Sequence, residues 1–223
     1  EEQLQTIREN LIPLLQQQQD HYRNQIKRGL RQHNVHLLDY KQLNKAQREW
    51  VRRYFQNSVF PVLTPLAVDP AHPFPFVSNL SLNVAAVIRD PETGQQQFAR
   101  VKVPQKNLPR FVAIPPSYSG SRPKPIHTAI LQEQVIAFNL EMLFPGMSIE
   151  GHYFFRVTRD ADLELRDLEA DDLMLALEQG LRKRRIGGEV VRLEVPNEMP
   201  EEVIELLKSG LAIDQDDVYV IDG

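Results

Sequence analysis

Residues 80–103 read Leu-Ser-Leu-Asn-Val-Ala-Ala-Val-Ile-Arg-Asp-Pro-Glu-Thr-Gly-Gln-Gln-Gln-Phe-Ala-Arg-Val-Lys-Val, and this stretch decides the fold class. Apolar side chains alternate with other residues in 80–90 and again in 97–103, the pattern of strands with at least one buried face. Pro91 and Gly94 lie between them, and both are residue types that tight turns favour. The stretch therefore predicts a β-hairpin.

The chain before the hairpin is helical in pattern. Residues 1–34 carry apolar side chains every three or four positions, which is the stripe of an amphipathic helix. Pro13 lacks an N–H group and its ring clashes with the carbonyl four residues back. It therefore predicts either a kink near Glu9 or a helix start at Pro13 itself.

A second helix follows a turn and a short extended stretch. Asn44 and Gln47 have the spacing of a capping box, in which each side chain accepts a hydrogen bond from the other's backbone N–H. We expect the two helices to form a helical hairpin over residues 1–57. Five prolines within residues 61–75 then exclude a helix or a central strand.

The remaining residues, 58–223, are expected to form one α+β domain with a largely antiparallel sheet. Helices and strands come in irregular order, which argues against a doubly wound parallel sheet. Besides the hairpin, the pattern predicts a helix over 127–143, a strand over 149–158, a helix from Asp171 to Arg185, a strand over 190–195, a helix over 200–209 and a strand over 218–221.

The composition excludes several classes of protein. The 223 residues contain no cysteine, which excludes disulfides, a cysteine nucleophile and cysteine metal sites. The formal charge of −4 provides no global field to attract nucleic acid or anionic lipid. No apolar run approaches the roughly 20 residues of a membrane-spanning helix. We interpret the chain as a piece of a longer polypeptide. We expect that polypeptide to be cytoplasmic, and any membrane association would arise through the full-length protein.

Two arginines are the first candidates for anion binding. If Phe155 and Val157 point into the core, Arg156 projects from the other face of the strand, and Arg159 follows just past its end. Two guanidinium groups can hold phosphate oxygens in a fork geometry. The alternative is a salt bridge from these arginines to the acidic residues that follow, Asp160, Asp162 and Glu164.

A second basic group ends the helix expected after Asp171, and it consists of Arg182, Lys183, Arg184 and Arg185. Each phosphate that such a group neutralises adds a salt-dependent contribution to binding. The alternative is a solvated helix end, where positive charge favours the helix dipole.

The sequence supplies no complete catalytic set and no metal site. His33 and His36 are three residues apart without a carboxylate at ligand spacing, and the pair Asp160 and Asp162 is explained by a solvated turn. No phosphate-binding glycine loop, dinucleotide fingerprint or HExxH motif occurs. The residues alone indicate a binding, positioning or assembly module with local basic patches.

Several motifs resemble the bacterial polyphosphate kinases of the histidine-phosphorylated type. They occur in the family's order and span essentially the whole chain: residues 60–75 with 79–83, residues 103–104 with 109–111, residues 153–162, and residues 191–195. The resemblance implies a parent enzyme that transfers the terminal phosphate of ATP reversibly to polyphosphate, using Mg²⁺ and a phosphohistidine.

The resemblance also implies where this chain belongs in that enzyme. It matches the end of an N-terminal helical domain plus the head domain, so the catalytic histidine is expected beyond Gly223, and no catalytic residue is assigned here. A homodimer through the head domain is implied, and Arg156, Arg159 and residues 182–185 are the candidates for guiding polyphosphate.

Three hypotheses remain at this point. In the first, the chain is the assembly and substrate-channel part of a polyphosphate kinase and is inactive by itself. In the second, it is a stand-alone module that binds RNA or another polyanion. In the third, it is a purely structural dimerisation module. Aromatic and basic residues are not interleaved as a nucleic-acid platform requires, so we expect no nucleic-acid partner.

Overall fold

The computed structural model describes residues 2–68, 74–118, 127–160 and 188–221. The helices are α1 (Glu2–His21), α2 (Lys27–Gln32), α3 (Lys45–Tyr54), α4 (Gln132–Ala137) and α6 (Glu201–Leu211). The strands are β1 (Val35–Leu38), β2 (Leu66–Val68), β3 (Leu82–Arg89), β4 (Gln96–Lys102), β5 (Phe111–Ala113), β6 (His127–Leu131), β7 (Ser148–Arg159), β8 (Val190–Val195) and β9 (Val218–Val220). π-Helical turns at Tyr22–Ile26 and Phe55–Val59 join α1 to α2 and extend α3.

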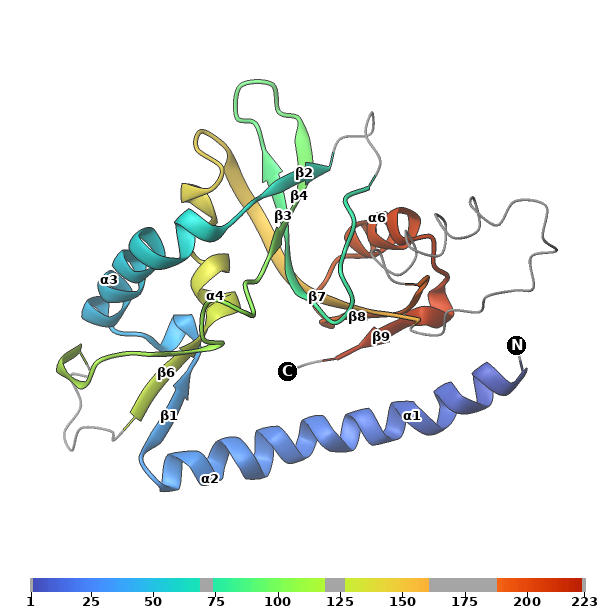
Figure 1. Ribbon diagram of the computed structural model, residues 1–223, viewed down its shortest axis with the longest axis horizontal. Coiled ribbons are helices and arrows are strands. Elements are labelled where there is room, and N and C mark those ends of the chain that lie inside the picture. Colours follow the sequence, from blue (N-terminus) through green and yellow to red (C-terminus); the bar gives the residue numbers. More distant parts are fainter. Residues whose placement is uncertain (1, 69–73, 119–126, 161–187, 222–223) are drawn as a thin grey trace, which may run out of the picture.

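The strands form two sheets (Figure 1). The larger has the order β2-β4-β3-β7-β8-β9, and all its neighbours are antiparallel except β8 and β9. The smaller has the order β1-β6-β5, with β1 parallel and β5 antiparallel to β6. The expected α+β class with a largely antiparallel sheet is confirmed.

The predicted hairpin is present as β3 and β4, and it anchors both cores of the domain. Its turn is closed by a hydrogen bond from Gly94 N to Asp90 O at 2.8 Å, and Gly94 has a φ of 71°, which glycine adopts without strain. Successive residues of β3 point to opposite faces, so Val84 joins one buried cluster and Ala85 joins the other. The larger sheet is therefore buried on both faces near β3.

Helix α3 packs on the first of these clusters. Val51, Phe55 and Val59 are fully buried together with Val84 from β3. The capping box at the start of α3 is confirmed, because Gln47 N donates to Asn44 Oδ1 and Asn44 N donates to Gln47 Oε1, both at 2.9 Å. The boundary expected at residues 57/58 stays a prediction, although buried residues on both sides of it share one core.

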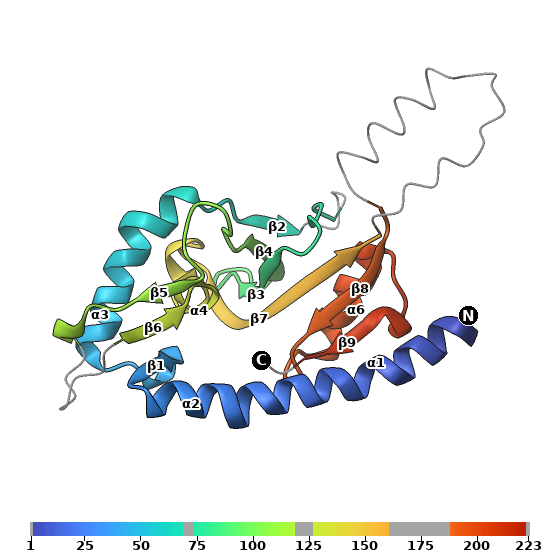
Figure 2. The ribbon, with the colours of Figure 1, turned by 60° about the horizontal axis from the view of Figure 1, so that its bottom comes forward.

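Helices α1 and α2 run along one side of the molecule, while α3 lies on a different side (Figures 1 and 2). The two parts of the expected helical hairpin are connected through β1, which pairs with β6. The expected helix start at Pro13 is wrong, because α1 begins at Glu2 and contains Pro13. Proline removes one backbone N–H donor from the helix, and the backbone hydrogen bonds of the flanking turns maintain the helix.

The helix predicted over 127–143 is wrong in its first part. Residues His127–Leu131 form β6, and only Gln132–Ala137 form α4, followed by a 3₁₀ turn at Leu140–Met142. The apolar spacing in this segment fits either a helix or a strand. The strand forms because β6 pairs with both β1 and β5. The strands expected near 149–158, 190–195 and 218–221 and the helix near 200–209 are confirmed. The helix expected from Asp171 to Arg185 lies outside the described residues.

Candidate functional site

Strand β7 presents the first candidate arginine as the sequence predicts. Phe155 and Val157 are 1% and 0% exposed in the second core cluster, whereas Arg156 projects from the opposite face with 46% of its side chain exposed. The alternation follows from the two-residue period of a strand. Arg156 therefore stands at a surface, with its backbone fixed by a buried strand.

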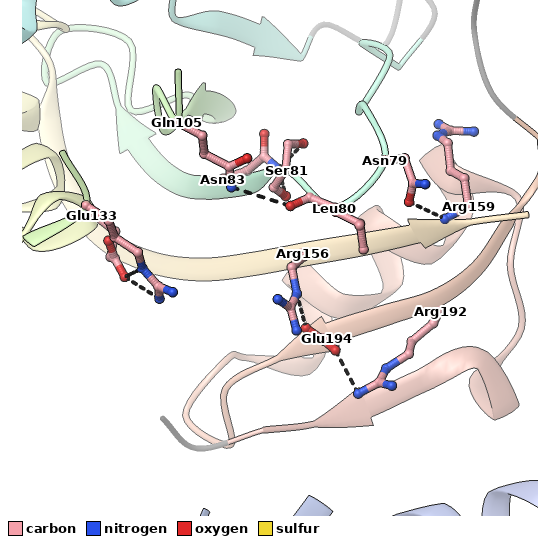
Figure 3. Close-up of polar contacts among 11 residues, drawn as sticks. Asn79, Leu80, Ser81, Asn83, Gln105, Glu133, Arg156, Arg159, Arg192 and Glu194 are labelled. Atoms are coloured by element: carbon pink, nitrogen blue, oxygen red, sulfur yellow. Dashed lines mark hydrogen bonds and ion pairs between the residues drawn. The ribbon is translucent and has the colours of Figure 1, made fainter. Parts of the chain in front are cut away.

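Arg156 is paired with a carboxylate of the neighbouring strand (Figure 3). Its Nε donates to Glu194 Oε2, and Arg192 Nη2 lies 2.7 Å from Glu194 Oε1. The Glu194 side chain is only 10% exposed, and the hydrogen bond and charge of Glu194 raise the pKa of Arg156. The salt-bridge alternative is thus the observed one for Arg156, with Glu194 as the acid. Of the acids that the sequence suggested, Asp162 and Glu164 lie outside the described residues.

Tyr219 of β9 extends this group to helix α1. The guanidinium carbon of Arg192 lies 4.7 Å from the centre of the Tyr219 ring, and that of Arg8 lies 4.8 Å from it. Arg8 also donates to the backbone oxygens of Asp216 and Val218, the latter at 2.9 Å. We call Arg8, Arg156, Arg192, Glu194 and Tyr219 the arginine cluster. It carries three positive charges against one negative charge, but its guanidinium groups are held by the fold.

Arg159, the second candidate, is engaged with the backbone. Its Nε donates to Val77 O at 2.7 Å and its Nη1 to Gly188 O at 2.9 Å, and its guanidinium lies 4.5 Å from the Phe76 ring centre. Its own N–H donates to Asn79 Oδ1 at 2.8 Å (Figure 3). Burial lowers the pKa of Arg159. Arg156 and Arg159 therefore make separate sets of contacts and do not form one fork.

Beside Arg159, the backbone at Asp160 is hydrogen-bonded to the backbone at Gly188 and Glu189. Gly188 N donates to Asp160 O at 3.1 Å, and Asp160 N donates to Glu189 O at 2.8 Å. A Cβ atom at Gly188 would lie 2.5 Å from Asp160 O, so only glycine fits this approach. The candidates Arg182, Lys183, Arg184 and Arg185 lie outside the described residues.

Sequence reasoning missed the residues that neutralise or flank Arg156. Arg192 and Glu194 are two apart in a predicted strand, and this spacing places them on one face. That signal was available. The approach of Arg8 to Tyr219, 211 positions along the chain, has no local signal, because it depends on where α1 docks.

Arg100 of β4 is another arginine that the sequence did not single out. It is 6% exposed, and its Nη1 donates to Phe76 O at 3.0 Å and Asn83 Oδ1 at 3.4 Å. Burial lowers the pKa of this guanidinium. It holds the segment before β3 against the sheet, which is a structural role.

The described residues do not contain a cluster of three or more His, Cys, Asp or Glu side chains suited to a metal ion. His152, a partly buried histidine, packs edge-on against Phe138 with ring centres 5.1 Å apart. Burial first, and the charge of Lys41 second, lower the pKa of His152. No helix in the described part of the chain is long and apolar enough to cross a membrane.

Residues 46–223 match the family model described as the polyphosphate kinase middle domain. The chain is 78% identical over 222 residues to a polyphosphate kinase of Parasynechococcus marenigrum and 70% identical over 222 residues to one of Prochlorococcus marinus. Each alignment covers 100% of this chain and 31% of the relative. The chain thus spans about a third of the length of these relatives.

The fold is similar to that of a solved structure. The crystal structure of a polyphosphate kinase from Porphyromonas gingivalis superposes with a TM-score of 0.78 at 25% sequence identity. The match covers 98% of this chain and 30% of that chain.

Proposed function

The chain belongs to the polyphosphate kinase family, as its middle domain, and from this premise we propose that it is the assembly and substrate-channel portion of such an enzyme. The parent enzyme transfers the terminal phosphate of ATP reversibly to polyphosphate through a phosphohistidine outside this chain. Mg²⁺ and ATP bind that parent, and the remainder of the parent polypeptide is the partner of this domain. The parent acts as a dimer in the cytoplasm, with contacts through this domain.

The observation that carries the proposal is the family match over residues 46–223. Phosphoryl transfer needs a nucleophile in line with the phosphorus and cations to neutralise the developing charge. The arginine cluster and Arg159 offer positive charge on a rigid sheet. A contribution of Arg156, Arg159 and residues 182–185 to polyphosphate guidance remains part of the proposal.

The test compares ATP-dependent polyphosphate synthesis by this chain with that of a polypeptide extended to the length of its relatives. We expect the extended polypeptide to make polyphosphate and to incorporate phosphate on a histidine, while the 223-residue chain does neither. Synthesis by the 223-residue chain alone would contradict the assignment of chemistry to the other domains. An extended polypeptide with no kinase activity would contradict the proposed function itself.

Assembly is tested separately by measuring the mass of both polypeptides in solution. A dimer of the extended polypeptide that becomes a monomer when this domain is deleted supports a role in assembly. A dimer that persists after deletion excludes that role.

A further inference from the structure

Helix α3 and the turn before it are locally basic, although the whole chain is acidic. Residues 40–53 contain five basic side chains and one acidic side chain, a local charge of +4, whereas the whole chain carries −4. A local excess of one sign attracts an oppositely charged polymer even when the net charge does not. Residues 23–31 carry the same local charge, with four basic side chains and no acidic one, so the way the structure displays the charges has to distinguish the two segments.

One side of α3 faces the core and another faces solvent. Val51 and Phe55 are fully buried, whereas Lys45, Arg48 and Arg52 are exposed and follow each other at i, i+3 and i+7. This spacing places the three cations on one stripe of the helix. The helix rises about 10 Å along the stripe. The buried side fixes the helix, so the cations project from a rigid support.

An open pocket of about 400 Å³ lies along this stripe, and its lining residues are Tyr40, Leu43, Lys45, Arg48, Glu49 and Arg52. Arg48 is positioned in it by a hydrogen bond from its Nη2 to Lys41 O at 2.9 Å, and its guanidinium lies 5.7 Å from the Tyr40 ring centre. We call Lys41, which lies in the 3₁₀ turn before α3, together with Lys45, Arg48 and Arg52 of α3 the α3 basic face.

The charges of this face are largely available. In the described part of the chain, Lys41, Lys45 and Arg48 make no ion pair. Arg52 pairs with Glu141 at 3.0 Å, but both side chains are more than half exposed, so the pair is weak and an anion can compete for it. Glu49 is the acidic residue among those that line the pocket, and it leaves a positive surplus.

We propose that the α3 basic face binds a stretch of polyphosphate. This inference rests on the proposed function, which makes polyphosphate the polyanion that the parent handles. A chain of phosphates presents closely spaced negative charges without bases, and the face presents a row of cations without a stacking platform. Binding here gives the growing chain a track on the middle domain, outside the catalytic domains.

The aromatic rings near the face favour polyphosphate over RNA. Tyr40 is stacked on Phe138 with ring centres 4.2 Å apart, and Arg48 lies near the same Tyr40 ring. Tyr118 is flanked by Trp50 and Arg53. Single-stranded nucleic acids gain much of their affinity from bases stacked on open aromatic faces. These rings are already in contact with neighbours of the same chain.

The experiment measures binding of fluorescent long-chain polyphosphate to the full 223-residue chain over a salt series. The test variant combines Lys41→Gln, Lys45→Gln and Arg48→Gln, which removes three charges without introducing repulsion. The matched control combines Arg28→Gln, Arg31→Gln and Lys106→Gln, which are equally exposed and remove the same charge elsewhere. Circular dichroism and thermal unfolding confirm that both variants are folded.

We expect the test variant to bind polyphosphate at least about tenfold more weakly than the unsubstituted chain, with a shallower dependence of affinity on salt, because fewer counterions are released. The control should lose less than about threefold through the change in net charge alone. Equal losses in the two variants, or no loss in the test variant, would overturn the proposal. Tighter binding of single-stranded RNA of equal charge than of polyphosphate would overturn it as well.

The same substitutions in the extended polypeptide separate this inference from the proposed function. Suppose that the extended polypeptide makes polyphosphate, and that its triple variant makes chains of the same length and binds polyphosphate with the same affinity. The α3 basic face is then excluded as a polyphosphate site, and the proposed function stands. If the extended polypeptide has no kinase activity while the 223-residue chain binds polyphosphate through α3, the proposed function fails and the binding surface stands.

Discussion

The arginine cluster on β7, β8 and α1 and the α3 basic face differ in how their charges are used. In the cluster, Arg156 and Arg192 share the Glu194 carboxylate, and Arg8 is held by backbone oxygens. On α3, Lys45 and Arg48 are exposed and make no ion pair in the described part of the chain, although Arg48 donates a hydrogen bond to Lys41 O. Both regions are basic in sequence. The comparison teaches that a basic residue is a candidate for anion binding only if no acidic group of the chain already pairs with it.

The largest expected effect tests whether α3 is a rigid support. Phe55→Ala should lower the free energy of unfolding by about 4 kcal/mol, because it opens a cavity beneath the helix where Phe55 is 0% exposed. Leu14→Ala on α1, where the side chain is 61% exposed, should change it by less than about 0.5 kcal/mol. Urea unfolding measures both values, and similar losses at the two sites would contradict the packing of α3 into the core.

The next effect tests whether Glu194 holds the arginine cluster together. Glu194→Gln should cost about 2 to 3 kcal/mol, because it leaves Arg156 and the mostly buried Arg192 without their shared carboxylate. Glu150→Gln, which breaks the more exposed pair with Arg89, is the matched control and should cost less than about 1 kcal/mol. A Glu194 variant as stable as the Glu150 variant would show that the cluster is not structural.

A smaller effect tests the structural role of Arg159. Arg159→Met should cost about 1 to 2 kcal/mol, because Val77 O and Gly188 O each lose a charged hydrogen-bond donor. Hydrogen exchange of the amides of Asp160 and Gly188, which join the chain beside Arg159, should accelerate in this variant. Unchanged exchange would argue that Arg159 is free to serve a ligand.

The smallest effect concerns His152, which lies close enough to Lys41 of the α3 basic face to sense its charge. The pKa of His152 is lowered from 6.5 in the folded chain by burial and by Lys41, with Glu198 acting in the opposite direction. Protonation therefore favours the unfolded state, and the free energy of unfolding should fall as the pH drops below about 6.5. His152→Phe should remove that part of the pH dependence.

The same histidine reports on the α3 basic face. Polyphosphate bound at Lys41 would offset the lysine charge, so it should raise the pKa of His152 in an NMR titration. A pKa of 6.5 or above in the unliganded chain would contradict the account of this histidine.

The sequence was sufficient where one local period dominated. The hairpin at 80–103, the capping box at Asn44 and the exposed position of Arg156 all follow from the spacing of neighbours. It was insufficient where tertiary pairing chose between two periods, as in β6. It was also insufficient where a partner came from a distant segment, as when Arg8 reaches Tyr219.

The candidate site shows the same division. The sequence identified Arg156 and Arg159 as candidates. It could not show that Arg156 pairs with Glu194, or that Arg159 donates hydrogen bonds to two backbone carbonyl oxygens. No role was predicted for Lys45, Arg48 or Arg52 from the sequence. In the described part of the chain, burial of the opposite side and the absence of ion pairs on Lys45 and Arg48 distinguish the stripe, while Arg52 pairs with Glu141.

The most direct test of the central claim is a comparison of two single substitutions of the same kind, Arg48→Gln on α3 and Arg156→Gln on β7. Each removes one guanidinium, and polyphosphate affinity is measured for both at one moderate salt concentration. Because Arg48 has no acidic partner in the described part of the chain and Arg156 shares Glu194, the account predicts a loss of about threefold for Arg48→Gln and less than about twofold for Arg156→Gln. The reverse order would contradict the account and place the polyphosphate track on the sheet.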